Sequence, residues 1–304
     1  MSTLGLEMEY KRLNVRISND EEILDSEVAV EIASGVIRLL APNPSIYTGK
    51  GTNTYLISDD NSTLVIDPGP ADKGHISNII EISPNQIKAI AVTHTHIDHW
   101  PGTPMLKELT GASTYGYGKK DGFEPDFELS DFHKLEVNSR LLTCLYTPGH
   151  ASNHICYLLE DSDLLFTGDH LMNGATVIIP PPDGDMGDYI RSLRRLLEEF
   201  ENIKTIAPGH GRLINDPKTE IKKVIEHRLA RENKVIDALK LKDSQTIDEL
   251  LGYVYSDVSE QLYPLAKSSL FAHLRKLYDE SVVTGITDAG KVIKDDPHAK
   301  WKLI

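Results

Sequence analysis

The sequence predicts an α/β domain followed by a smaller domain of three helices and a β-hairpin. Short β-branched runs, each ending in a polar loop, fill the first two-thirds of the chain, and helical spacing of apolar residues dominates from residue 218. The charge changes at the same place: residues 1–217 carry 17 basic and 32 acidic side chains, whereas residues 218–304 carry 15 and 14. We therefore expect one domain over residues 1–217, with residues 1–27 as an N-terminal arm, and a second over 218–304.

The elements of the first domain follow from apolar patterning and turn residues. Asp59, Asp60 and Asn61 supply a turn between two strand-like runs, which we expect to pair as a hairpin. Helices are expected where apolar residues recur at helical spacing and where proline opens a first turn. Strands are predicted at residues 28–40, 52–57, 62–66, 87–92, 140–146, 154–160, 163–167 and 203–207, and helices at 76–82, 101–109 and 188–200.

The second domain has the element order of a winged-helix module. Helices are predicted at residues 219–241, 247–255 and 265–278, and short strands at 282–284 and 300–303. Because this part of the chain is almost neutral, we expect it to pack against its own chain rather than to bind DNA.

Composition narrows the class of protein. The net charge of −14 disfavours broad contact with nucleic-acid backbones but leaves room for a local basic channel. No apolar run is long enough to span a bilayer, and no secretory signal is evident at the N-terminus. Two cysteines, Cys144 and Cys156, lie in apolar runs and are expected to be buried small hydrophobic residues. A cytoplasmic location is expected.

Four ligand-type side chains stand within six positions, directly after the buried strand at 87–92. They are His94, His96, Asp98 and His99. Imidazole suits zinc and similar metals, while carboxylate adds negative charge that can hold a second cation. A core would have to compensate each of these polar groups, whereas a metal satisfies them together.

Three further positions have one local setting in common. His150, Asp169 and His210 each follow an apolar strand and a single glycine, which gives a tight turn from which one ligand side chain projects. Residues at the ends of scaffold strands are suited to building a rigid site.

The ordered set resembles the motif of the metallo-β-lactamase superfamily, H-x-H-x-D-H followed by H, D and H. The resemblance implies an αββα sandwich of two mixed sheets with helices outside. It also implies that one metal is held by His94, His96 and His150, and another by Asp98, His99 and His210, with Asp169 bridging. Asp67, which closes the strand at 62–66, matches the family aspartate that orients ligands. One departure is Trp100-Pro101-Gly102, where the family often has two glycines.

The wider match points to one group of the superfamily. The runs at 52–57, 146–150 and 207–211 look like the lactamase-beta-2-like group, and the C-terminal part resembles its winged-helix tail, so the resemblance covers residues 50–304. Neither cysteine stands at a ligand position, unlike the best-known β-lactamases. His96 replaces the glutamate of the diiron oxidoreductase branch, which favours hydrolysis.

The resemblance implies a metal-dependent hydrolase that binds two divalent metal ions. Zinc is expected first, and the same ligands accept iron or manganese. A metal-bridged hydroxide would attack the substrate. Asp98 and Asp169 are the expected catalytic carboxylates, acting as ligands first and as proton carriers second. His154 is expected to support the ligands or to line the site, with a purely structural role as the alternative, and His170 is expected to be structural.

Three functions stay open at this stage. The first is cleavage of a small-molecule ester, thioester or lactone, which suits the acidic body. The second is a phosphodiesterase or endoribonuclease acting on single-stranded RNA, which would need a basic channel from Lys119, Lys120 and the tail. The third, a non-enzymatic structural metalloprotein, hardly needs so complete a ligand set. Residues 172–185 and 111–122 are candidate walls of the substrate site. The oligomeric state is not predicted.

Overall fold

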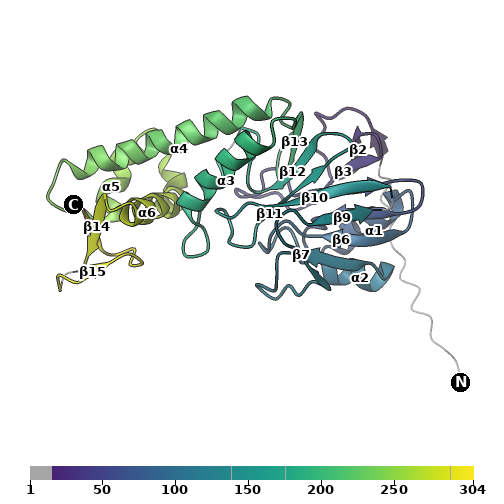
Figure 1. The fold of residues 1–304 in the computed structure, drawn as a ribbon, viewed down its shortest axis with the longest axis horizontal. Helices are drawn as coiled ribbons and strands as arrows, with labels where there is room; N and C mark the ends of the chain where they lie inside the picture. Colours follow the sequence, from purple (N-terminus) through teal and green to yellow (C-terminus); the bar gives the residue numbers. More distant parts are fainter. Residues whose placement is uncertain (1–15, 138, 175, 288) are drawn as a thin grey trace, which may run out of the picture.

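Two β-sheets lie face to face, with helices on their outer faces and a smaller helical unit at the C-terminal end (Figure 1). The computed structural model describes residues 16–137, 139–174, 176–287 and 289–304. The two sheets and their covering helices form the predicted αββα sandwich.

The first sheet contains eight strands in chain order. Strands β2 to β5 pair antiparallel, and β5 to β8 pair parallel, so the sheet is mixed. The predicted hairpin is present as β4 and β5. The strands are β1 (Arg16–Ser18), β2 (Val28–Ala33), β3 (Val36–Leu40), β4 (Asn53–Ser58), β5 (Thr63–Ile66), β6 (Ile87–Ala91), β7 (Ser113–Gly116) and β8 (Phe127–Glu128).

The second sheet has five strands in the order β13-β12-β11-β10-β9. Its last two strands along the chain, β12 and β13, run parallel, which brings their carboxyl ends to the same edge. The strands are β9 (Lys134–Val137), β10 (Arg140–Tyr146), β11 (Ile155–Leu159), β12 (Leu164–Gly168) and β13 (Thr205–Pro208).

Three apolar layers hold the sandwich together. Alternate residues of the facing strands, such as Ile57 and Tyr157, fill the space between the sheets. On the outer face of the first sheet lie α1 (Lys73–Ile82) and α2 (Thr103–Thr110), which bury Ile79 and Leu106 there. The outer face of the second sheet is covered by α3 (Met186–Glu199) and the first half of α4 (Pro217–Leu239).

The C-terminal unit has a core of its own around Trp301, whose side chain is fully buried. A capping box formed by Thr246 and Glu249 begins its first helix. Its elements are α5 (Ile247–Val254), the short 3-10 helix η1 (Glu260–Leu262), α6 (Tyr263–Asp279), β14 (Val283–Ile286), β15 (Val292–Ile293) and β16 (Lys300–Leu303). Together with the second half of α4, these elements follow the predicted winged-helix order of three helices and a hairpin.

Helix α4 connects the two units (Figure 1). Its first half packs Ile221 and Val224 into the layer under the second sheet, and its second half packs Val235 and Leu239 into the C-terminal core. The division at residue 217 stays a prediction, because the helix that begins there belongs to both cores.

The predicted strand at 28–40 is wrong as a single element. It forms two antiparallel strands, β2 and β3, joined by a turn at Ser34 and Gly35, and Gly35 adopts a φ of 69°. Strands β1, β7, β8, β9 and β15 were not expected from the sequence, since most are too short for alternation to be visible. Cys144 and Cys156 are buried and unpaired, as predicted. None of the helices in the described part of the chain is both long and apolar enough to cross a membrane.

Candidate metal centre

The seven predicted ligands come together in two adjoining groups at one edge of the sandwich. Within each group the potential ligand atoms all lie within 4.8 Å of one another. The first group is His94, His96 and His150, and the second is Asp98, His99, Asp169 and His210.

These side chains meet because each follows a strand that ends at this edge. The run from His94 to His99 follows β6, His150 follows β10, Asp169 follows β12 and His210 follows β13. Gly209 leaves the necessary space: a Cβ there would lie 2.7 Å from Asp169 Oδ1 and 2.8 Å from His99 Cε1. Only glycine therefore allows the chain to pass so close to two ligands.

The first group consists of three imidazoles whose nitrogens converge. His96 Nδ1 lies 3.0 Å from His94 Nε2 and 2.8 Å from His150 Nε2. A neutral ring nitrogen either donates or accepts, so one shared proton cannot satisfy all three atoms. A cation between them can accept all three lone pairs, as in tri-histidine zinc sites.

The second group combines two carboxylates with two imidazoles. His210 Nε2 lies 3.1 Å from Asp98 Oδ2 and 3.2 Å from Asp169 Oδ1. His99 Nε2 lies 3.5 Å and 3.4 Å from the same two oxygens. Two closely spaced negative charges, one of them buried, require compensating positive charge at this point.

Asp169 faces both groups with different oxygens. Its Oδ1 approaches His99 and His210, whereas its Oδ2 lies 3.6 Å from His150 Nε2 in the other group. A carboxylate between two clusters of ligand atoms is suited to bridging two cations.

Asp67 and Thr93 orient the ligands from behind. Asp67 Oδ2 accepts a hydrogen bond from His99 Nδ1 at 2.8 Å and one from the Thr93 hydroxyl at 2.7 Å. The Thr93 oxygen in turn lies 3.0 Å from His94 Nδ1. The outer nitrogens of His99 and His94 are thereby occupied, which leaves each Nε2 facing the centre. The sequence pointed to Asp67 but not to Thr93.

Two main-chain carbonyls orient two other ligand imidazoles by accepting hydrogen bonds from their outer nitrogens. His150 Nδ1 donates to the Ile178 carbonyl at 2.7 Å, and His210 Nδ1 donates to the Gly51 carbonyl at 3.1 Å. Residue type carries no signal for a carbonyl contact, so neither partner could be found from the sequence.

The two groups differ in charge preference. Burial lowers the pKa of His94 and His96, and it lowers the pKa of His150 to about 4, so these rings are neutral and their lone pairs are free for a metal. Burial opposes the charged form of His210 too, but Asp169 and Asp98 outweigh it and raise its pKa to about 10. Against burial, the histidines beside it hold the pKa of Asp169 well below its usual range.

The residues present fit a divalent metal centre. His99 Nε2, His210 Nε2 and Asp169 Oδ1 are buried, make no hydrogen bond and point at one another. Buried polar atoms without a partner are costly, and a cation satisfies all of them together.

His154 and His170 lie behind the centre. The His154 ring packs 5.0 Å from the His94 ring, and its Nδ1 lies 3.0 Å from the Thr147 hydroxyl. The His170 ring packs against His154 and Tyr189, and the His170 carbonyl accepts a hydrogen bond from the Tyr189 hydroxyl. Neither belongs to the two converging groups. His154 contacts the His94 ring, and its role as a support for the ligands stays a prediction.

A cavity of about 1310 Å³ opens onto the centre from the side of the C-terminal unit. His96, Asp98, His150, Asp169 and His210 all line it. Apolar side chains form much of the rest. They come from the loops after β3, β6 and β12, from the segment between α5 and α6, and from α6: Ile46, Tyr47, Ile97, Met172, Val177, Val258, Leu262 and Leu265.

Of the two segments proposed as walls of the substrate site, one lines this cavity. From the segment at 172–185, Met172, Asn173, Thr176, Val177, Ile178 and Pro180 line the cavity, whereas no residue of the segment at 111–122 does. That second segment is used in the fold instead, because β7 extends the first sheet and Tyr117 stacks on Tyr146 at 4.2 Å. The loop around Ile46 and Tyr47 was missed. In the sequence, its only signal is an apolar pair in a loop. In the structure, both residues are more than 60% exposed.

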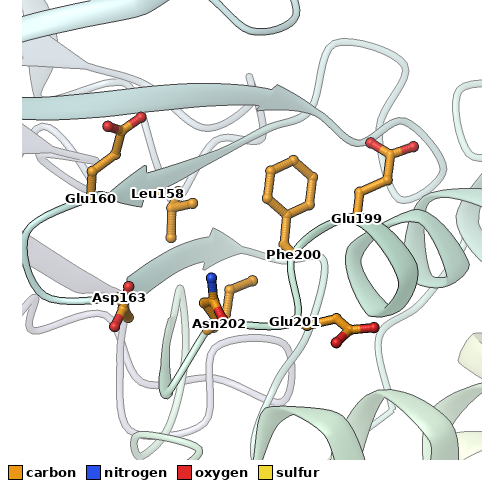
Figure 2. Close-up of a pocket in the computed structure, with 8 residues that line it drawn as sticks. Leu158, Glu160, Asp163, Glu199, Phe200, Glu201 and Asn202 are labelled. Carbon is orange, nitrogen blue, oxygen red and sulfur yellow. The ribbon is translucent and has the colours of Figure 1, made fainter.

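A smaller cavity of about 180 Å³ lies elsewhere, beside the end of α3 (Figure 2). It is lined by several carboxylates, but Asp163 pairs with Lys204 at 2.6 Å and Glu199 with Arg195 at 3.0 Å. It contains none of the converging ligand atoms, and we assign it no role in the chemistry.

Comparison with known proteins agrees with this geometry. Residues 47–210 match the family model of the metallo-beta-lactamase superfamily, and residues 246–301 match the beta-lactamase associated winged helix domain. A beta-lactamase-like protein 2 homolog from Drosophila melanogaster is 28% identical, over 82% of this chain and 89% of its own. An atrochrysone carboxyl ACP thioesterase from Aspergillus chevalieri is 31% identical, over 76% of each.

A solved structure has the same fold. A metallo-beta-lactamase family protein from Thermus thermophilus superposes with a TM-score of 0.73 at 20% identity, covering 90% of this chain and 100% of that one. The resemblance to the lactamase-beta-2-like group is also confirmed by the relative from Drosophila. This chain belongs to the metallo-beta-lactamase superfamily and is a hydrolase of that family.

Proposed function

We propose that this hydrolase cleaves an ester, thioester or lactone bond of a small molecule at a centre of two divalent metal ions. The observation that carries the proposal is the pair of adjoining ligand groups, joined by Asp169, at the floor of a largely apolar cavity. A purely structural metal site would be closed, whereas this one opens onto space for a substrate.

The ligand set divides naturally between two ions. His94, His96 and His150 would hold one, Asp98, His99 and His210 the other, and Asp169 would contact both. Zinc suits the histidine-rich set best, and iron or manganese are alternatives. When bound, such ions lower the pKa of a coordinated water toward neutrality and polarise a substrate oxygen.

The chain's own residues contribute position and charge. Asp67, Thr93 and the carbonyls of Ile178 and Gly51 fix the ring orientations, so little reorganisation is needed during the reaction. Despite burial, neighbouring histidines hold the pKa of Asp98 below its usual range, so it acts first as an anionic ligand. Its side chain is 21% exposed against 11% for Asp169, which makes it the better placed of the two to accept a proton.

The cavity favours a small substrate with apolar character over RNA. RNA binding needs free cationic side chains along a channel. Lys119 pairs with Glu124 at 3.1 Å and Lys120 pairs with Asp183, and neither lysine lines the cavity. Lys119 and Lys120 are therefore paired with carboxylates and lie outside the cavity, so a basic channel would have to come from the few cations of its wall, such as Lys50 and Arg228.

The name of one relative supports the same choice. The Aspergillus chevalieri protein is named as a thioesterase of an acyl carrier protein substrate, so we take a thioester as the first substrate to test.

The test is a substrate panel with metal-loaded protein: a thioester, a lactone, bis-nitrophenyl phosphate and single-stranded RNA. We expect turnover of the thioester or the lactone, with little dependence on salt. Cleavage of RNA that falls steeply with salt, without thioester or lactone turnover, would contradict the proposal and support the RNA alternative.

A further inference from the structure

Arg228 of α4 is a buried cation that lines the catalytic cavity. Only 3% of the residue is exposed. Buried charges in proteins are normally paired with an opposite charge, because removing an ion from water is costly. What compensates Arg228 therefore bears on what the cavity binds.

The protein provides only neutral partners for this guanidinium. One Arg228 Nη donates to the Val177 carbonyl, and the guanidinium carbon lies 5.4 Å from the centre of the Tyr189 ring. Its Nε is buried without a hydrogen bond. Among the residues that the structure describes, no carboxylate forms an ion pair with Arg228.

The cations next to Arg228, in contrast, form ion pairs with carboxylates. Arg231, one turn further along α4, donates to Asp257 at 2.7 Å, and Lys276 of α6 pairs with Glu232 at 2.8 Å. The fold thus provides acidic partners for the cations around Arg228 but not for Arg228.

The position of Arg228 relates it to the metal centre. It holds the carbonyl of Val177, and His150 holds the carbonyl of the next residue, Ile178. Successive residues lie ~3.8 Å apart along the chain. A group bound by Arg228 would therefore lie beside the loop that borders the centre, in the same cavity.

We propose that Arg228 binds an anionic group of the substrate, so that the enzyme acts on a thioester or ester carrying a carboxylate or a phosphate in addition to an apolar part. A guanidinium can form a two-pronged contact with either anion. Ser268 and Ser269 of α6 also line the cavity and add hydroxyl groups to its wall. The C-terminal unit thereby contributes to substrate selection. This inference rests on the proposed hydrolase function.

The test uses three thioesters and the full-length, metal-loaded enzyme. Hexanoyl- and adipoyl-N-acetylcysteamine have acyl chains of equal length that differ in a terminal methyl or carboxylate. Hexanoyl-coenzyme A places phosphates on the thiol side instead. We expect wild type to prefer one anionic compound over hexanoyl-N-acetylcysteamine in kcat/KM. Arg228→Gln should reduce that preference by at least about tenfold, the scale of a hydrogen bond to a charged group.

Matched variants separate the charge of Arg228 from its packing. Lys222→Gln removes a positive charge from an exposed position of the same helix and should leave the preference unchanged. Arg228→Lys keeps the charge but loses the two-pronged contact, so the preference should fall less than in Arg228→Gln. If Arg228→Gln does not fold, the lysine variant carries the test.

The outcomes show which side of the substrate carries the anion, and they separate failure of the Arg228 inference from failure of the hydrolase proposal. A lost preference for adipoyl assigns a carboxylate on the acyl side, and a lost preference for coenzyme A assigns phosphate on the thiol side. Hydrolysis with no preference for either anion, or a preference that survives in both Arg228 variants, overturns the inference while leaving the hydrolase proposal intact.

Binding provides a readout independent of turnover. If the anion is a carboxylate on the acyl side, calorimetry should show that the thioether analogue of the adipoyl compound binds Arg228→Gln more weakly than wild type, whereas the hexanoyl thioether binds both alike. If the anion is a phosphate on the thiol side, coenzyme A should bind Arg228→Gln more weakly than wild type. If no thioester is hydrolysed, this comparison still tests Arg228. The inference is overturned if wild type binds the two thioethers equally and also binds coenzyme A no better than pantetheine, its phosphate-free thiol part.

Discussion

Asp67 illustrates how one carboxylate can organise several ligands. It accepts hydrogen bonds from His99 Nδ1, the Thr93 hydroxyl and the Thr93 main-chain N–H, the last at 2.8 Å. It also adopts a φ of 50°, which asparagine tolerates better than most residues. Asp67→Asn therefore tests the carboxylate without straining the backbone.

We expect Asp67→Asn to weaken metal binding by about 10- to 100-fold, the usual effect of losing a partner behind a metal ligand. Competition with a chelating dye measures the change. Asp60→Asn, in the exposed turn before β5, is the control and should bind metal like wild type. Unchanged metal affinity in Asp67→Asn would show that the three hydrogen bonds do not position the ligands.

His75 gives a prediction about acid stability. Burial lowers its pKa to about 4 from the ordinary histidine value of 6.5. Its Nε2 contacts the Thr54 hydroxyl at 2.9 Å, and its Nδ1 is buried without a partner, so a second proton has no acceptor. The unfolded chain takes up this proton near pH 6.5 and the folded chain only near pH 4, so stability is full above pH 6.5 and falls as the pH drops between these values.

The His75 contribution lost between pH 7 and pH 5 is about 2 kcal/mol. Urea unfolding of wild type and His75→Gln at both pH values measures it. The free energy of unfolding of the variant should fall by about 2 kcal/mol less than that of wild type over this range. Equal losses in the two proteins would mean that His75 is not held neutral by the fold.

At the level of elements, the loop at 176–185 connects the metal centre with the rest of the cavity. It is held by His150 at Ile178, by Arg228 at Val177, and by Asp183, which contacts Lys120 and accepts the Ser152 N–H at 3.2 Å. The loop therefore ties α4 and the turn around Lys120 to a metal ligand.

Asp183→Asn should loosen this loop without destroying the centre. The ion pair with Lys120 is partly exposed, so its loss should cost about 1 kcal/mol or less, equivalent to at most about a fivefold loss of metal affinity. Hydrogen exchange should become faster in residues 176–185. Glu124→Gln, which breaks the exposed pair with Lys119, is the control. Unaltered exchange in this loop would show that Asp183 does not restrain it.

For the whole molecule, the sequence predicted the parts that depend on local signals. The ligand set was visible because each member follows a strand and the last three each follow a glycine, and the structure brings all seven together. The helices of the tail and its last strand were also visible from a local signal, the spacing of their apolar residues. Strand β8, with two exposed residues, and β1, inside the predicted arm, gave no periodicity to detect.

Features that depend on long-range packing were not predictable. The cavity wall contributed by α4, α6 and the segment before α6 depends on how α4 crosses from one core to the other. The unpaired state of Arg228 depends on which carboxylates the fold brings near it. Neither property can be inferred from the spacing of residues or from composition.

The most direct test of a two-metal hydrolytic centre is to remove and restore the metal. Metal-stripped protein should not hydrolyse the best substrate of the panel, and titration with zinc should restore activity as binding approaches two ions per chain, measured by elemental analysis. Asp169→Ala, which lacks the carboxylate facing both groups, should lose both metal and activity. Metal-free protein that hydrolyses the substrate at the rate of the loaded enzyme would contradict the account.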